Sequence, residues 1–290
     1  MTTAHNGSGP TVRRMQLGAK LRALREARGI TREAAGHEIR GSESKISRME
    51  LGRVSFKERD VVDLLKLYRV DDPVEVERML ALTKEANAPG WWQPYNEQYP
   101  TWFQNYLGLE EASTLIRTYE VQFVPGLLQT EAYARAVIML GHAQNDAADL
   151  DRRVALRMAR RTLLDRANGP RLWAVLDEAV LRRPIGGHDV LRQQVAHLLE
   201  RCQHPNVRLQ VIPFLSGGHA AAGGAFTILR FPLEDLADTV YIEQLTSALY
   251  LDKPEDVDRY TAAVSKLFIE AEPPSRTPDI LRNVLRDLTR

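Results

Sequence analysis

Apolar side chains recur with helical spacing through the first third of the chain. Leu17, Leu21 and Leu24 lie three or four residues apart and are followed by Gly29, which predicts a first helix that ends there. The same spacing predicts four further helices, over residues 31–39, 42–51, 56–68 and 73–88. The pattern therefore predicts an all-α domain of five helices over residues 13–88.

The second and third of these helices form a helix-turn-helix pattern. Residues 31–52, TREAAGHEIRGSESKISRMELG, place Thr31 and Ser42 where N-caps are needed and Gly52 where a helix ends. Four apolar residues can face a shared core: Ala35, Ile39, Ile46 and Met49. Five polar residues of the second helix point outward, where they can reach DNA: Glu43, Ser44, Lys45, Ser47 and Arg48.

Beyond residue 110 the pattern mixes helices with strands. Helical spacing covers residues 110–118, 129–140, 149–166, 188–201, 254–271 and 278–288, and strand-like runs cover 172–176, 207–212, 225–231 and 239–243. The strand, helix and strand between 172 and 212 predict a parallel pair, whereas the last two strands predict a hairpin. We expect an α/β domain with a mixed sheet over 111–272, and a separate C-terminal helix over 273–290.

Two segments do not fit either pattern. Residues 1–12 lack periodicity and are predicted to be a disordered tail. Residues 89–110 form an aromatic-rich connector, since 7 of the 20 aromatic residues of the chain (4 Trp, 9 Tyr and 7 Phe) lie between Trp91 and Tyr106. These rings either bind a partner or ligand or pack the two domains and their cores. The binding candidates are Trp91, Trp92, Tyr95, Trp102, Phe103 and Tyr106.

Charge is distributed unevenly along the chain. Residues 1–70 hold 15 Lys and Arg against 8 Asp and Glu, a net charge of +7, and the whole chain holds 39 against 38. Residues 71–290 therefore hold 24 against 30, a net charge of −6. A basic N-terminal domain attracts a phosphate backbone. Its arginines taken alone are equally compatible with an ordinary solvated surface, but their coincidence with the helix pair favours DNA.

The composition limits the compartment and the cofactors. No run of eighteen apolar residues and no apolar signal-peptide segment is present, so we expect a soluble, cytoplasmic protein without a membrane partner. Cys202 is the single cysteine, which excludes an intrachain disulfide. Cys202 and His204 lack the further ligands that zinc requires, so no metal site and no cofactor are predicted.

The remaining chemical candidates do not predict an enzyme. The glycine-rich residues 217–226 lack a phosphate-loop pattern and favour a mobile loop. Ser216 and His219 would suit a hydrolase, but nothing places Ser216 on a nucleophile elbow. Asp177 and Glu178 follow a strand, where active sites of α/β proteins form, yet two acids also suit the start of a helix. We expect no catalytic residues.

The motifs also resemble a known family. Residues 17–70 resemble the xenobiotic-response-element (XRE), or phage-repressor-like, helix-turn-helix domains, in which SKISRMELG matches the recognition-helix pattern. The segments beyond residue 90 resemble the C-terminal domain of the WhiJ-like regulators of actinobacteria, and the likeness covers about residues 15–275. It rests on WWQPYNEQYPTWFQNYLGLEEAS, RTYEVQFVPGLLQTEAYARAV, LWAVLDEAVLRRPIGG, VRLQVIPF and VYIEQLTSALYLDK.

The resemblance implies roles for individual residues. Glu43, Ser44 and Ser47 would contact base edges, and Arg48 a base or a phosphate. Arg32, Ser42, Lys45 and Arg53 complete the implied DNA-binding set, with Arg32 and Lys45 on phosphates. Glu50 takes the place of a glutamate that is structural in the family. Arg40 stands where the family has a glycine, so we expect the turn to shift by a residue or to be of another type.

The resemblance implies a transcriptional regulator of the antitoxin-like kind. Such a protein would be a homodimer on double-stranded DNA in the nucleoid, and a small companion protein would control it through the C-terminal domain. The alternative is a repressor that responds to a small-molecule effector bound in the α/β domain. The sequence does not identify the operator, the companion or the effector.

Overall fold

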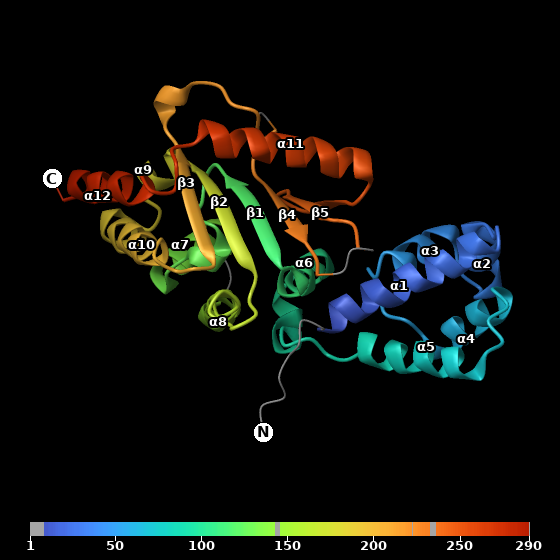
Figure 1. The fold of residues 1–290 in the computed structure, drawn as a ribbon. Coiled ribbons are helices and arrows are strands. Elements are labelled where there is room, and N and C mark those ends of the chain that lie inside the picture. The colour runs from blue at the N-terminus through green and yellow to red at the C-terminus, as the bar shows by residue number, and fades with distance from the viewer. Residues whose placement is uncertain (1–8, 143–145, 222, 233–235, 290) are drawn as a thin grey trace. The chain divides into compact units, whose positions relative to one another are not determined.

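The structure, a computed structural model, describes residues 9–142, 146–221, 223–232 and 236–289 and divides into two compact units (Figure 1). The helical unit comprises the described residues of Met1–Pro94, Gln104–Ala112 and Pro232–Leu236. The α/β unit comprises those of Tyr95–Phe103, Ser113–Phe231 and Ala237–Arg290. A helical helix-turn-helix region followed by a domain with a mixed sheet confirms the predicted fold class.

Five helices form the first part of the helical unit, as predicted. They are α1 (Pro10–Ala27), α2 (Arg32–Glu38), α3 (Glu43–Glu50), α4 (Glu58–Leu67) and α5 (Pro73–Ala86). Their apolar stripes meet in one core, in which Leu17, Ile46 and Val61 are at most 1% exposed. The Thr31 and Ser42 hydroxyls accept hydrogen bonds from the Ala34 and Lys45 amides at 3.1 and 3.2 Å, so both predicted N-caps are confirmed.

Two predicted segments differ from the structure. Helix α1 begins at Pro10, so residues 10–12 are not a disordered tail, while residues 1–8 lie outside the described residues. Proline favours the first turn of a helix, which explains the earlier start. The aromatic-rich connector contains a 3-10 helix, η1 (Gln93–Gln98), and the helix α6 (Thr101–Ala112).

The α/β unit contains a six-stranded sheet of order β3-β2-β1-β4-β5-β6. The strands are β1 (Leu115–Glu120), β2 (Arg171–Asp177), β3 (Val207–Ile212), β4 (Phe226–Arg230), β5 (Thr239–Glu243) and β6 (Ala248–Leu251). β2 is parallel to β1 and to β3, and the other neighbours are antiparallel. The predicted parallel pair, hairpin and mixed sheet are therefore confirmed.

The central strand β1 was not predicted. We predicted a helix over 110–118, whereas residues 115–120 form a strand that pairs with β2 on one side and β4 on the other. Ile116 to Tyr119 are all buried, so the strand has no exposed face and lacks the alternation of apolar and polar residues on which a strand prediction depends. The short strand β6 was also missed.

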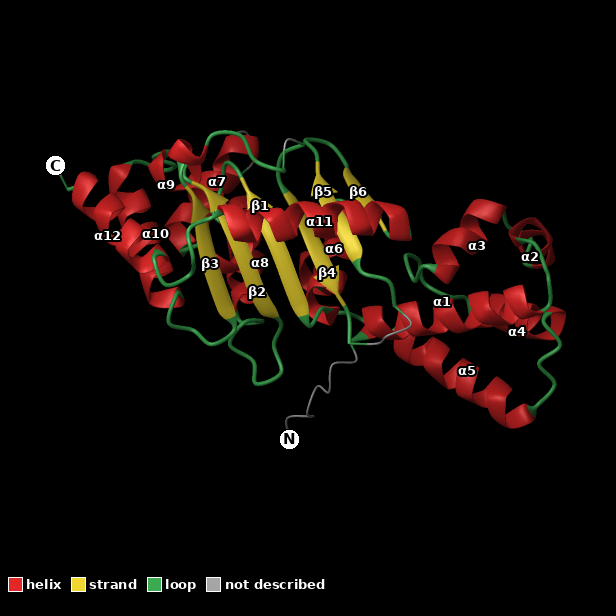
Figure 2. Cartoon of the chain, turned by 45° about the horizontal axis from the view of Figure 1, so that its top comes forward, coloured by secondary structure: helices red, strands yellow, loops and turns green. Residues whose placement is uncertain are grey.

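Helices cover both faces of the sheet (Figure 2). They are α7 (Glu131–His142), α8 (Ala147–Arg161), α9 (Ala179–Arg182), α10 (His188–Arg201), α11 (Pro254–Glu270) and α12 (Thr277–Asp287), with short 3-10 turns η2 (Gly126–Leu128) and η3 (Phe214–Ser216). Helix α11 crosses one face, where Val264 and Leu267 pack on Tyr119 and Ile228, and α8 lies on the other. None of the described helices combines the length and the apolar composition of a membrane span.

Candidate nucleic-acid interface

The helix pair α2 and α3 is held by a small apolar core and a close backbone approach. Ala35, Ile39, Ile46 and Met49 are each at most 2% exposed, as the pattern predicts. A Cβ on Gly36 would lie 2.9 Å from the backbone carbonyl carbon of Ser42, so only glycine lets α2 approach the start of α3 this closely. The sequence thus fixes the position of α3 against α2.

Arg40 adopts the left-handed conformation that we expected the turn to avoid. Its φ is +53°, and it follows the last residues of α2. The Gly41 amide donates to the Gly36 carbonyl at 2.8 Å and the Arg40 amide to His37 at 3.0 Å, which is a Schellman motif. The expected shift of the turn is therefore wrong. These two hydrogen bonds offset the roughly 1–2 kcal/mol that a left-handed non-glycine residue costs.

The outer face of α3 presents polar side chains to solvent. Glu43, Ser44 and Arg48 are exposed, and Ser47 is half-buried. The Arg48 Nε donates to the Ser44 carbonyl at 3.3 Å, which places the guanidinium along the outer face of the helix. Short hydroxyls and a guanidinium on an exposed helix are the groups that read base edges in a major groove. Ser42 is exposed beside them as the N-cap.

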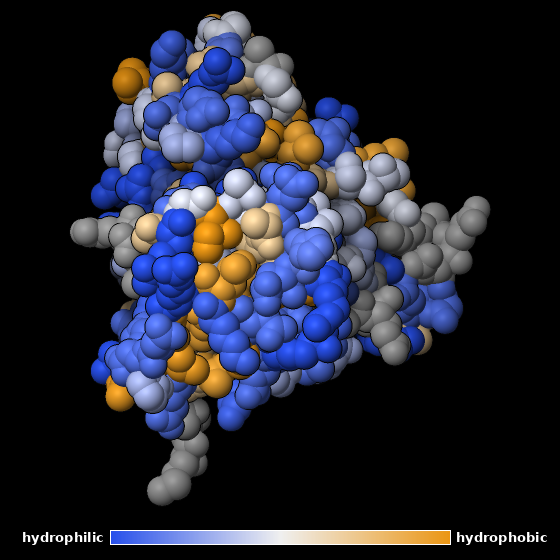
Figure 3. Space-filling view, turned by 90° about the vertical axis from the view of Figure 1, so that its right-hand side faces the viewer, coloured by the Kyte–Doolittle hydropathy of each residue, from blue (hydrophilic) through white to orange (hydrophobic). Residues whose placement is uncertain are grey.

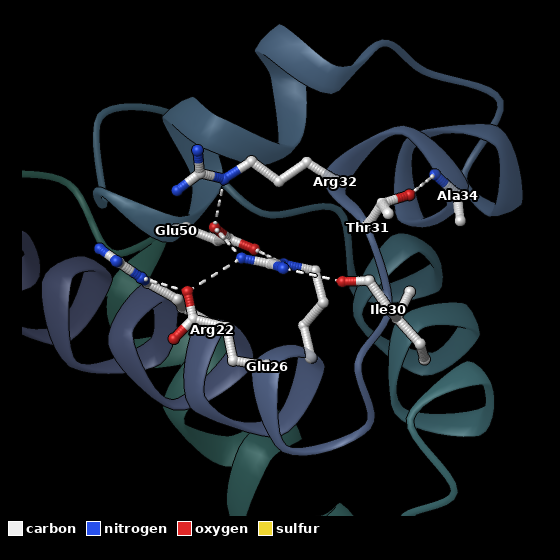
Figure 4. A network of polar contacts seen from close by, with 8 residues as sticks. Arg22, Glu26, Ile30, Thr31, Arg32, Ala34 and Glu50 are labelled. Carbon is white, nitrogen blue, oxygen red and sulfur yellow. Dashed lines mark hydrogen bonds and ion pairs between the residues drawn. The ribbon is translucent and has the colours of Figure 1, made fainter.

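A buried ion-pair network ties α1, α2 and α3 together (Figure 4). The Glu50 side chain is 2% exposed and accepts hydrogen bonds from the Arg25 Nε at 2.5 Å and the Arg32 Nε at 3.0 Å. Arg25 also donates to the Ile30 carbonyl at 2.8 Å. The hydrogen bond with Glu50 raises the pKa of Arg25, so its guanidinium stays charged despite burial.

This network bears on two sequence-based interpretations. Glu50 lies where a structural glutamate was expected, inside the domain and away from solvent. The Arg32 Nε pairs with Glu50, while the Arg32 side chain remains 34% exposed. Its role at a DNA phosphate therefore stays a prediction, in which Glu50 would orient the guanidinium that grips the phosphate.

Lys45 and Arg53 also have partners within the protein. The Lys45 Nζ lies 2.6 Å from the Asp60 Oδ2, and the Asp60 side chain is 1% exposed. The Asp60 Oδ1 accepts no hydrogen bond from the described residues, but the exposed Arg59 Nη2 lies 3.7 Å from it, so Lys45 and Arg59 share the compensation of this buried carboxylate. Arg53 is half-buried. Contacts of Lys45 and Arg53 with phosphate stay predictions.

The six aromatic binding candidates divide by exposure. Trp92, Phe103 and Tyr106 are at most 8% exposed, whereas Trp91, Tyr95 and Trp102 are half-buried. The burial of Trp92, Phe103 and Tyr106 favours a role in packing, because a partner would have to displace the surrounding residues to reach these rings. The half-buried rings stay candidates for a partner or ligand.

Neighbours within each unit explain this packing. In the α/β unit, Phe103 stacks on Tyr99 with ring centroids 4.8 Å apart, and the Arg160 guanidinium lies 5.4 Å from the Phe103 centroid. The Tyr250 hydroxyl donates to the Trp102 carbonyl. In the helical unit, Trp92 meets Trp91 edge to face at 6.0 Å.

Several other chemical candidates of the α/β unit have hydrogen-bond partners within the protein. The His219 Nε2 lies 2.8 Å from the Tyr119 hydroxyl, and its Nδ1 accepts from the Ala221 amide. Asp177 accepts from the amide of Ala179 at the start of α9. Burial raises the pKa of the Cys202 thiol to about 11, so it is a poor nucleophile near neutral pH. No group of three or more His, Cys, Asp or Glu suited to a metal occurs within the described ranges.

Glu120 is a titratable group that the sequence did not single out. It ends β1 on the α8 face of the sheet, accepts a hydrogen bond from the Thr118 hydroxyl at 3.2 Å and has Glu243 and Arg157 nearby. Burial, and to a lesser extent Glu243, raises its pKa to about 8. Had residues 115–120 been recognised as a strand, the carboxyl group at its end would have marked Glu120 as a candidate.

The raised pKa of Glu120 predicts a pH-dependent stability. The folded protein holds this proton up to about pH 8 and the unfolded chain releases it near the ordinary value of 4.5, so stability falls as pH rises between them. We expect Glu120→Gln to be more stable than the wild type at pH 8 by on the order of 2 kcal/mol, a value reduced for partial exposure. Denaturant unfolding at pH 5 and pH 8 measures the difference in free energy of unfolding between the variant and the wild type. The same difference at both pH values would refute the prediction.

Two family profiles match the chain. One, described as a domain of unknown function (DUF5753), matches residues 103–283. The other, described as a helix-turn-helix domain, matches residues 16–79 and includes α2, the turn and α3. No curated protein and no solved structure matches the chain.

Proposed function

Because this chain belongs to the DUF5753 family and carries a helix-turn-helix domain before the domain that defines it, we propose that it is a sequence-specific transcriptional regulator. The outward face of α3, with exposed Ser44 and Arg48 and half-buried Ser47 on a helix positioned by α2, is the observation that supports this most strongly. A net charge of +7 over residues 1–70 supports attraction to DNA. The regulator acts at the nucleoid in the cytoplasm.

The regulator is a dimer in this proposal. Helix-turn-helix modules bind paired half-sites, and dimerisation sets the spacing between these half-sites. Figure 3 shows a band of hydrophobic side chains between hydrophilic ones on the helical unit, and Val74 of this unit is 55% exposed. An apolar band on a basic surface suits a self-complementary contact between two copies.

The α/β unit receives the controlling signal from a small companion protein. Large apolar side chains are exposed on this unit, among them Leu215 and Leu245 at 99% and Ile269 at 84%. Exposed leucine and isoleucine side chains of this size suit a protein partner. The alternative is a small-molecule effector, which the buried polar cluster around Glu120 favours.

The DNA-binding proposal predicts a loss of sequence discrimination. Replacing Ser44, Ser47 and Arg48 together by alanine removes the outward polar groups of α3 but no core residue. We expect preference for an operator, selected from random duplexes, over unrelated DNA to fall about 5- to 150-fold through loss of a bidentate Arg48 contact, which is worth roughly 1–3 kcal/mol, and further for each lost serine contact. Binding competition at one salt concentration measures it.

Arg78→Ala is the matched control for this variant. Its side chain is 72% exposed on α5, so the variant loses a positive charge from the same unit without touching α3. The control should retain discrimination. Unchanged discrimination in the triple variant would show that α3 is not the reading helix.

Native mass spectrometry of protein purified from its source separates the two modes of control. A co-purifying small polypeptide favours the companion protein, and a bound metabolite favours the effector. Dimer mass in the same spectrum tests the oligomeric state, and a monomer bound to a full operator would contradict the dimer.

A further inference from the structure

Four adjacent strands of the α/β unit each place an arginine on the same face of the sheet. In the register, Arg208, Trp173, Arg117 and Ile228 form one row across β3, β2, β1 and β4. Arg171 and Arg230 lie in the next row, both paired with Leu115. Side chains two residues apart on a strand share a face, so the four arginines form a zigzag about 15 Å wide, at roughly 4.8 Å per strand.

Helix α11 covers only part of this arginine face. In the first row, Trp173 stacks on Phe268 of α11, and Ile228 belongs to the apolar core under this helix. Helix α11 packs on Tyr119, Val175 and Phe226, which are closer to the carboxyl ends of β1 and β2 and to the start of β4. In Figures 1 and 2 the amino ends of β2 and β3 extend beyond α11 on that face. Accordingly Arg171, Arg208 and Arg230 are exposed.

The positive charge of the arginine face is only partly compensated. Asp238 pairs with Arg117 at 3.3 Å and with Arg230 at 3.0 Å. Among the described residues Arg171 has no side-chain partner, and Arg208 contacts only the Trp173 ring, at 5.3 Å from its centroid. Four guanidinium groups and one carboxylate leave a net charge of +3 on this face.

Arg117 adds a second feature that costs stability on this face. Its side chain is 10% exposed, and its buried Nε has no hydrogen-bond acceptor among the described residues. Burial and then the charge of Arg230 lower its pKa. Like charges on neighbouring strands destabilise a sheet, and a buried unpaired donor costs about 1–3 kcal/mol. Features that cost stability are typical of binding surfaces.

We propose that the arginine face binds the phosphate backbone of duplex DNA, as a contact additional to that of the helix-turn-helix. The inference rests on the proposed function, which already brings the chain to DNA. Arginine is suited to phosphate because its planar guanidinium donates in a fork. Contact with phosphates adds affinity and register without reading sequence.

The chemistry of the face favours duplex DNA over single strands. Single-stranded binding uses free aromatic rings on which bases stack. The one aromatic residue in these rows, Trp173, is stacked on Phe268 with centroids 3.8 Å apart and an interplanar angle of 12°, and Arg208 lies against the same ring. Three exposed guanidinium groups, those of Arg171, Arg208 and Arg230, without a free ring suit a backbone of regularly spaced phosphates.

The salt dependence of binding to random-sequence duplex tests this proposal without an operator. We expect the full-length double variant Arg171→Gln and Arg208→Gln to lose about 1.8 from the slope of log affinity against log salt, at about 0.9 per phosphate contact. Between about 50 and 200 mM salt, wild-type affinity should then fall about 12-fold more than that of the variant. Arg171→Gln alone, which disturbs no packed ring, should show half of the slope change.

Arg192→Gln with Arg282→Gln is the matched control. These side chains are 48% and 59% exposed on α10 and α12, so the control removes the same net charge from other surfaces of the unit. Its slope should equal that of the wild type. An unchanged salt slope in the arginine-face variants overturns the proposal. If the same variants also lose binding to poly-glutamate, the face binds an acidic polypeptide instead of DNA. Operator discrimination by the α3 variant is a separate measurement, so failure of the proposed function can be distinguished from failure of the arginine-face proposal.

Discussion

Glu50→Ala is expected to destabilise the helical unit by about 3–5 kcal/mol, because it leaves the buried Arg25 guanidinium with only the exposed Glu26, at 3.3 Å, as a counter-charge among the described residues. The side chains of Arg25 and Glu50 are 8% and 2% exposed, and Arg25 reaches solvent poorly once the carboxylate is gone. Arg32 loses the same partner. Chemical denaturation followed by circular dichroism measures the change in free energy of unfolding.

The cost should come from the broken pair and not from loss of a helical glutamate. Glu33→Ala removes an exposed glutamate from α2 and should change stability by less than about 0.5 kcal/mol. Replacing the pair by apolar residues, as in Arg25→Met with Glu50→Leu, should cost less than Glu50→Ala alone. A free energy of unfolding for Glu50→Ala within about 1 kcal/mol of the wild-type value, roughly the experimental error, would mean that the network does not hold the three helices together.

Gly18→Ala is expected to disrupt the packing of α1 on α3. A Cβ at this position would lie 2.4 Å from the Met49 carbonyl oxygen and 2.5 Å from that of Glu50, and backbone atoms cannot move aside as a flexible side chain can. Forced overpacking costs about 1–3 kcal/mol or more, which outweighs the gain of up to about 1 kcal/mol in helix propensity. Thermal unfolding and the affinity for DNA should both decrease, because α3 is displaced.

Gly141→Ala gives the opposite sign and serves as the control. Gly141 also lies in a helix, α7, but a Cβ there meets no atom within 4 Å, so only the propensity gain remains. The two variants make the same chemical change in different surroundings. A Gly18→Ala protein as stable as the wild type would mean that α1 and α3 are further apart than the structure places them.

The helix-turn-helix was predictable because its signals are local. Caps, glycines and apolar spacing all lie within a few residues of the helices that they define, and Thr31 and Ser42 cap where they were expected to. Arg40 shows the limit of a local rule. The rule counted the cost of a left-handed arginine but not the hydrogen bonds of Gly41 and Arg40 that close the turn.

Contacts between distant residues were not predictable in the same way. Nothing in the spacing of Arg32 and Glu50 indicates that they meet, because the pairing depends on how α2 and α3 pack. The composition of the aromatic segment does not indicate which rings are exposed. Only the structure shows that Trp92 is buried and Trp91 half-buried. The arginine face is a further case, since its four members lie on four strands and converge only through the register.

The central position of β1 has a consequence for how the chain is made. β1 is the first strand to leave the ribosome, yet Leu115 pairs with Arg171, 56 positions later, and with Arg230, 115 positions later. A nascent chain that has completed β2 and β3 therefore still exposes the β4 side of β1 as an unpaired edge. During that interval this edge is the part of the sheet most open to pairing with another chain, and arrival of β4 closes it.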